Sequence, residues 1–140
     1  MELQSVVLYQ PEDVTASSLP DGVNALSEFI QQLVAAMSLE FVNDGPCSRA
    51  LVVGLTPDRC AFWILHPDGT TAERSGVDAR LSSVTRPRVV GVPIAFALIL
   101  RHGEDFPRSD GPPLPKEWVN AVQQAGTPLR IDEILTALLS

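Results

Sequence analysis

The first 48 residues contain no lysine and no arginine. They do contain seven acidic residues, so this part of the chain has a formal charge of −7. Residues 49–140 hold ten acids and ten bases, which cancel. An acidic surface repels nucleic acid and anionic membranes and attracts basic partners. The charge therefore argues against a nucleic-acid or membrane partner and favours a basic protein.

Cysteine and histidine are scarce, with two of each. The hairpin predicted below puts Cys47 and Cys60 about eight strand positions out of register, beyond the reach of a disulfide. Together with His66 and His102 they lack the short paired spacings of structural zinc sites. Cys60 and His66 lie about 20 Å apart on one strand, too far for a catalytic pair, whereas Cys60 with His102 stays open. We expect no metal and no cofactor.

The chain also lacks a long hydrophobic run. Its longest, 89–100, is too short for a membrane-spanning helix, which needs about 20 residues. The first residues have no basic region before an apolar stretch, as a signal peptide would have. With 140 residues, 45% of them apolar, the sequence predicts a single domain over 1–140, soluble and cytoplasmic.

Apolar residues at helical spacing predict one long helix in the N-terminal part of the chain. It follows a predicted loop over 11–22, with Asp21 as its N-cap. Two shorter helices are predicted near the C-terminus, over 115–124 and from 131 onward, the first ending at Gly126. A less regular helical turn is predicted around 77–84. The stripe of the long helix comprises Leu26, Phe29, Ile30, Leu33, Val34 and Met37, and that of the 115–124 helix Trp118, Val119 and Val122.

Four strands are predicted, over 3–9, 47–55, 60–66 and 89–100. The middle two form a hairpin around a four-residue turn, with Leu55 opposite Cys60 and Val52 opposite Trp63. Both faces of this hairpin are apolar. Either the hairpin is central with both faces covered, or one face is a contact surface.

The last strand has one bulky face and one small, smooth face, which permits close approach of another layer or of a partner. Pro93 lies within this run and implies an edge position, a bulge or a break, because proline cannot donate to a ladder. The order of elements predicts an α+β fold. Its antiparallel sheet has about four strands, with one long N-terminal helix and two short C-terminal helices packed mainly on one face.

The one-sided charge, the apolar hairpin and the lack of a catalytic motif favour a non-enzymatic protein-binding domain. It would dock a basic or partly apolar protein. By size, charge and class the chain is similar to toxin-immunity proteins and type III secretion chaperones, which implies an inhibitor or adaptor role. The candidate contact residues are Glu12, Asp13, Glu28, Asp44 and Trp63.

Two alternatives stay open. One is a small enzyme or ligand-binding protein, with a pocket between the long helix and the sheet and with His102, Glu104 and Asp105 at its mouth. The other is a homodimer formed through the smooth face of the last strand or through the second face of the hairpin.

Overall fold

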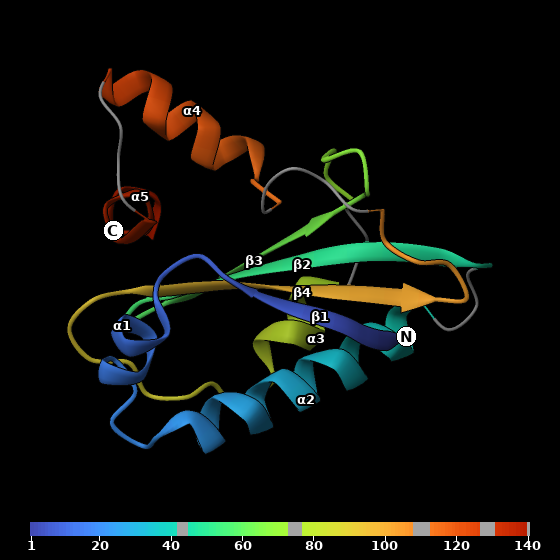
Figure 1. The fold of residues 1–140 in the computed structure, drawn as a ribbon, viewed down its shortest axis with the longest axis horizontal. Helices are drawn as coiled ribbons and strands as arrows, with labels where there is room; N and C mark the ends of the chain where they lie inside the picture. The colour runs from blue at the N-terminus through green and yellow to red at the C-terminus, as the bar shows by residue number, and fades with distance from the viewer. Residues whose placement is uncertain (42–44, 73–76, 108–112, 127–130, 140) are drawn as a thin grey trace.

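The computed structural model describes residues 1–41, 45–72, 77–107, 113–126 and 131–139. These residues form an α+β fold with a four-stranded antiparallel sheet, as the sequence predicts (Figure 1). The elements in chain order are β1 (Glu2–Leu8), α1 (Glu12–Ser17), α2 (Val23–Phe41), β2 (Cys47–Leu55), β3 (Cys60–Leu65), α3 (Val77–Ser82), β4 (Ile94–His102), α4 (Lys116–Ala125) and α5 (Ile131–Leu139).

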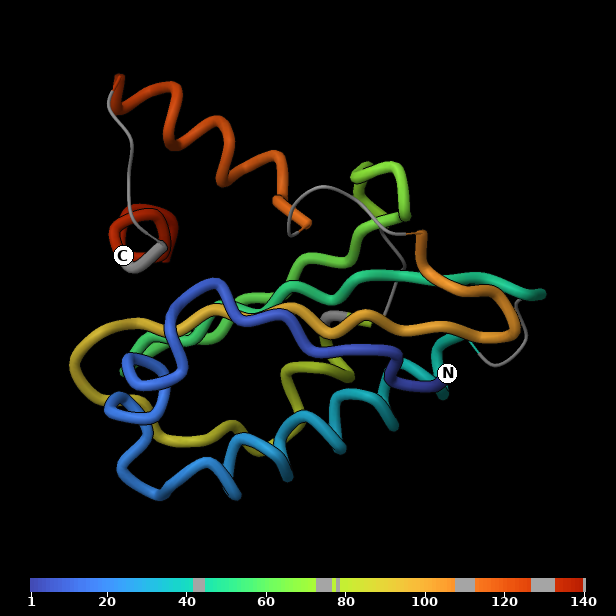
Figure 2. Tube along the Cα trace, in the orientation of Figure 1, coloured from blue at the N-terminus to red at the C-terminus, as the bar shows by residue number. Residues whose placement is uncertain are grey.

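The strands are ordered β1-β4-β2-β3, so β4 and β2 are central and β1 and β3 are the edges. Figure 2 shows the first strand running beside the last one. Each pair of neighbours is antiparallel. The register predicted for the β2–β3 hairpin is confirmed, with Leu55 opposite Cys60 and Val52 opposite Trp63.

Helices cover both faces of the sheet, so the prediction that they pack mainly on one face is wrong. Figure 1 shows α2 and α3 on one side, here called the first face, and α4 and α5 on the other, the second face. The long helix is α2, which follows β1 and α1 and is therefore not an N-terminal helix. No helix in the described residues combines the length and apolarity needed to cross a membrane.

The core on the first face is built from the predicted stripe of α2. Phe29, Leu33 and Met37 are buried there against the bulky side chains of the sheet. Phe29 meets Phe96 of β4 edge to face, with ring centroids 6.4 Å apart. This packing secures the long helix under the middle of the sheet.

The core on the second face depends on small residues. Ala95 and Ala97 of β4 are buried there beneath α4 and α5, so the predicted smooth face admits another layer of the same chain. Trp118 of α4 is 1% exposed, whereas Val119, also predicted to be buried, is 40% exposed. The hairpin thus has both faces covered, and the surfaces considered for a dimer lie largely inside the molecule.

Three local boundaries differ from the prediction. The supposed loop over 11–22 contains α1, whose first turn holds two acids as the helix dipole favours. Because α2 begins at Val23, Asp21 lies one residue before the cap position and pairs with Arg88 instead. β4 begins only after Pro93, consistent with a residue that cannot join a central ladder.

Candidate functional site

Among the described residues, one long side of β1 has no neighbouring strand. The Tyr9 N–H donates to the Ala95 carbonyl at 3.3 Å, which fixes the phase of the β1–β4 ladder. Backbone groups alternate in an antiparallel pair, so those of Val7 face β4 and those of Val6 and Leu8 face outward. Within the described part of the chain, no other segment bonds to these outward groups.

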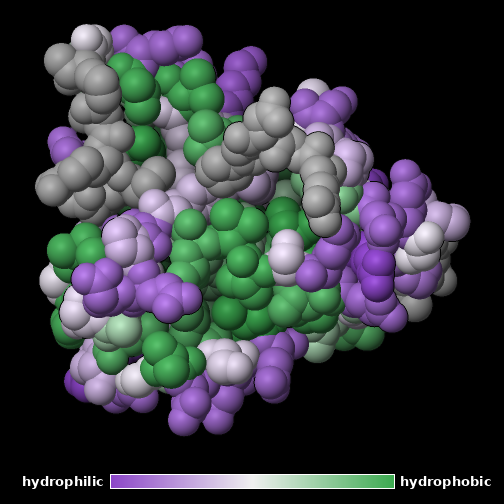
Figure 3. Space-filling model, viewed as in Figure 1, coloured by the Kyte–Doolittle hydropathy of each residue, from purple (hydrophilic) through white to green (hydrophobic). Residues whose placement is uncertain are grey.

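Apolar side chains accompany this open side. Leu3 is 40% exposed and Val6 is 41% exposed, while Leu8 is half-buried against the first-face core. Figure 3 shows an apolar area over β1, bordered by hydrophilic residues. We call the outward backbone of Val6 and Leu8, with the exposed side chains of Leu3 and Val6, the β1 edge. An uncovered edge of this kind can pair with an extended chain.

Three of the predicted contact acids lie on the two helices that follow β1 in the chain. Glu12 and Asp13 occupy the first turn of α1, which follows β1 after a short connection. Glu28 is exposed in the first half of α2, whereas the hydrogen bonds between the start of the chain and this helix join Met1 to Ser38. In the described residues none of these three carboxylates has a basic partner. The candidate site thus comprises the apolar β1 edge and the exposed acids of the helix that follows it in the chain.

The other N-terminal acids are paired within the chain. Glu2, Asp21 and Glu40 lie 3.3, 3.4 and 2.7 Å from Arg101, Arg88 and Arg80, respectively. All three partners come from the second part of the sequence. Asp44, the remaining acid of the predicted contact set, lies outside the described residues.

Trp63 lies on the opposite edge strand, three strands from the β1 edge. Its ring meets that of Trp118 edge to face, with centroids 5.4 Å apart. The C-terminal end of β3 also has a backbone partner within the chain, since the Ala72 N–H donates to the Ile64 carbonyl at 2.7 Å. The structure thus brings Glu12 and Asp13 together but leaves Trp63 apart from them.

Cys60 lies far from both histidines along the strands. Cys47 lies opposite His102 in the β2–β4 register, whereas Cys60 lies at the far end of the sheet, across from Leu55 and Ile94. Along β4 that separation is about 26 Å, which rules out the Cys60–His102 pair. No group of three or more potential metal ligands occurs among the described residues.

The residues expected at the mouth of a pocket do not line the cavity under the sheet. Asp105 pairs with Arg101, and Glu104 is exposed after the end of β4. His102 borders a separate pocket of about 350 Å³, together with Met1, Glu2, Arg101 and Gly103. The cavity between α2 and the sheet has other walls, described below.

No family model matches the chain, and neither the curated proteins nor the solved structures provide a match. The site must be understood from its own geometry.

Sequence reasoning missed the β1 edge. Its signal was present, because 3–9 is a strand whose apolar residues are not confined to one face. That it lies at an edge follows from its pairing with β4, which begins more than 80 residues later.

Proposed function

We propose that the protein is a non-enzymatic protein-binding domain whose β1 edge accepts an extended segment of a basic partner protein. The observation that carries this proposal is the outward backbone of Val6 and Leu8 beside exposed Leu3 and Val6. In this mode main-chain hydrogen bonds supply affinity, and contacts to alternate side chains supply specificity. The partner strand would extend the sheet to five strands.

The charge of the site selects the partner. Glu12, Asp13 and Glu28 are exposed and unpaired in the described part of the chain, and the whole protein carries −7. Lysine or arginine at the end of the incoming segment nearest α1 would meet these carboxylates. A second copy of this chain would bring another −7 toward the same edge, so repulsion favours a basic partner over a homodimer.

An inhibitor or a secretion-chaperone-like adaptor would use this arrangement directly. Both act by holding a segment of another protein, and neither needs a reactive side chain at the contact. The neutral Cys60 is compatible with such a role.

The test uses two fluorescent seven-residue peptides, one alternating valine with lysine and one alternating valine with glutamate. We expect saturable binding of the basic peptide in fluorescence anisotropy and none of the acidic one. Val6→Lys should weaken binding by about tenfold or more, because it places a like charge on the edge. Leu39→Lys, at an exposed apolar residue of α2, is the matched control and should leave affinity unchanged.

Three outcomes contradict the proposal. Equal binding of both peptides would show that charge does not select the partner, and equal loss in both variants would place the contact elsewhere. Light scattering gives the third, because a mass of twice 15.1 kDa that Val6→Lys returns to the monomer value would assign the edge to a second copy.

A further inference from the structure

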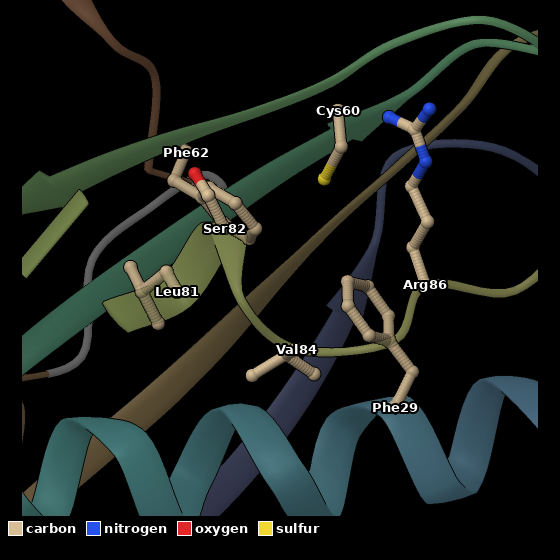
Figure 4. A pocket seen from close by; sticks show the side chains of 7 residues that line it. All are labelled: Phe29, Cys60, Phe62, Leu81, Ser82, Val84 and Arg86. Carbon is tan, nitrogen blue, oxygen red and sulfur yellow. The ribbon is translucent and has the colours of Figure 1, made fainter. Parts of the chain in front are cut away.

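A cavity of about 160 Å³ lies between α2, β3, α3 and the segment that follows α3 (Figure 4). It lies beside β3, the edge strand at the other end of the sheet from β1, so its lining does not include the residues of the β1 edge. Its lining residues are Phe29, Cys60, Phe62, Leu81, Ser82, Val84 and Arg86.

The walls of the cavity are apolar in its buried part and polar where it meets solvent. Phe29 and Leu81 are each 1% exposed and form the buried part. Ser82 and Arg86 are exposed, so the cavity opens to solvent beside a hydroxyl and a guanidinium. Figure 4 shows the Phe29 ring below the cavity and the Cys60 sulfur pointing into it. An amphipathic ligand would match this gradient.

Arg86 lies at the mouth of the cavity, where a backbone hydrogen bond holds it. Its Nη2 donates to the Asp58 carbonyl at 3.0 Å, which leaves its other N–H groups available. In the described residues no acid pairs with it, whereas Arg80, Arg88 and Arg101 each have an acidic partner. A guanidinium fixed by one bond can use its remaining donors on a carboxylate.

Cys60 does not compete for this charge. Burial raises the pKa of its thiol from 9.0 to about 12, and nearby Arg86 offsets the shift only in part. The thiol is therefore neutral at physiological pH and neither neutralises Arg86 nor acts as a nucleophile.

We infer that this cavity binds a small apolar carboxylate, with its hydrocarbon part among Phe29, Phe62 and Leu81 and its carboxylate on Arg86. The volume sets the size, since a cavity of about 150 Å³ accommodates one benzene. One aromatic ring or a short acyl chain therefore fits. Phosphate fits less well, because the apolar walls offer no donors to its other oxygens.

The test is a titration of the isotope-labelled protein with sodium benzoate, followed by NMR. Benzoate should shift the amides of Cys60, Phe62 and Val84 with a dissociation constant of about 1 mM or below. Benzyl alcohol, which keeps the ring without the charge, should bind about tenfold more weakly, and inorganic phosphate should shift none of these amides.

Variants test the charge contact. Arg86→Gln should weaken benzoate binding about tenfold or more, because it removes the charged donor. Arg88→Gln, an equal charge change two residues away, should alter it less than about twofold, since Arg88 does not line the cavity. No shifts at about 10 mM benzoate, or equal effects of the two arginine variants, would overturn the inference.

Discussion

At the scale of single residues, Cys60 illustrates how burial changes a reactive side chain. The chain offers it as a possible nucleophile, and the fold places its sulfur in a cavity where ionisation is costly. The sequence alone predicts the strand position of Cys60. It does not predict the cavity, because α2 and the segment after α3 close over the thiol only in the folded chain.

Alkaline pH should therefore weaken the fold through Cys60. The unfolded thiol loses its proton near pH 9.0, whereas the folded one keeps it until about pH 12, so the folded state binds more protons in this window. Stability then falls as pH rises, by at most about 1.4 kcal/mol per pH unit from this residue. Urea unfolding of wild type and of Cys60→Ala between pH 8 and about 11 measures the difference.

The variant is expected to start less stable, because it removes buried atoms, but to lose less stability with pH. Burial also raises the pKa of Tyr9, which is present in both proteins. Both therefore lose stability through Tyr9 to the same extent at higher pH. If the free energy of unfolding fell equally with pH in the two proteins, the Cys60 thiol would not be the cause of the loss.

Trp63 marks the limit of residue-level prediction. The alternation of the hairpin correctly places it on the second face, where an uncovered tryptophan would be a contact residue. Its actual neighbour is Trp118, which arrives from a helix more than 50 residues later. The amphipathic pattern of that helix shows that it packs on an apolar surface but not on which one.

At the scale of elements, local pairing was predictable and distant pairing was not. The β2–β3 register follows from one turn and from the side-chain alternation, which is why every predicted pair is confirmed. The order of β1 and β4 depends on contacts across most of the chain, and neither strand contains a local signal for it. The β1 edge could not be found before that order was known.

The surroundings of Gly54 show how closely α5 approaches the sheet. A Cβ added at Gly54 of β2 would lie 3.4 Å from the Trp63 ring. The nearer obstacle is Leu135 of α5, whose Cδ2 would be 2.6 Å away. Because Leu135 is fully buried, it cannot simply turn aside. The glycine thus sets the spacing between the second face and its helix.

Gly54→Ala should lower the free energy of unfolding by about 1–3 kcal/mol, as overpacking of a core does. Leu135→Ala alone should also destabilise, by about 2–5 kcal/mol. Denaturant unfolding of both single variants and of the double variant closes a mutant cycle. We expect the double variant to be more stable than the sum of the two losses implies, whereas strict additivity would place the two residues out of contact.

At the scale of the whole molecule, the fold reunites charges that the sequence separates. Three N-terminal acids pair with Arg80, Arg88 and Arg101 from the second part of the chain. These pairs are partly or largely exposed, so each contributes little stability. Their main effect is to neutralise three of the N-terminal acids, so that the negative potential comes mainly from Glu12, Asp13 and Glu28. The direction of that field could not be read from the sequence, since pairing depends on the fold.

Partner association should respond to this field. The triple variant Glu12→Gln, Asp13→Asn, Glu28→Gln should slow association of the basic valine–lysine peptide severalfold at low salt, with dissociation less affected. At about 0.5 M salt the difference should largely disappear. Stopped-flow fluorescence measures both rates.

The matched control is Asp58→Asn, Glu104→Gln, Glu117→Gln, which changes the net charge equally at exposed residues elsewhere. If both triple variants slow association alike, net charge alone steers the partner. If neither does, the N-terminal acids serve only to keep the protein dispersed.

The central position of β4 also governs the order in which the protein can form on the ribosome. β1 and β2 both need β4 as a neighbour, yet β4 is translated last of the four strands. At about 5–20 residues per second, β1 waits roughly 5–20 s for its partner. During that delay the nascent chain can complete only the β2–β3 hairpin and its helices. Both long sides of the β1 backbone, including the one that we assign to partner binding, are therefore exposed during translation. In that interval a chaperone or the partner protein could bind β1 before β4 pairs with it.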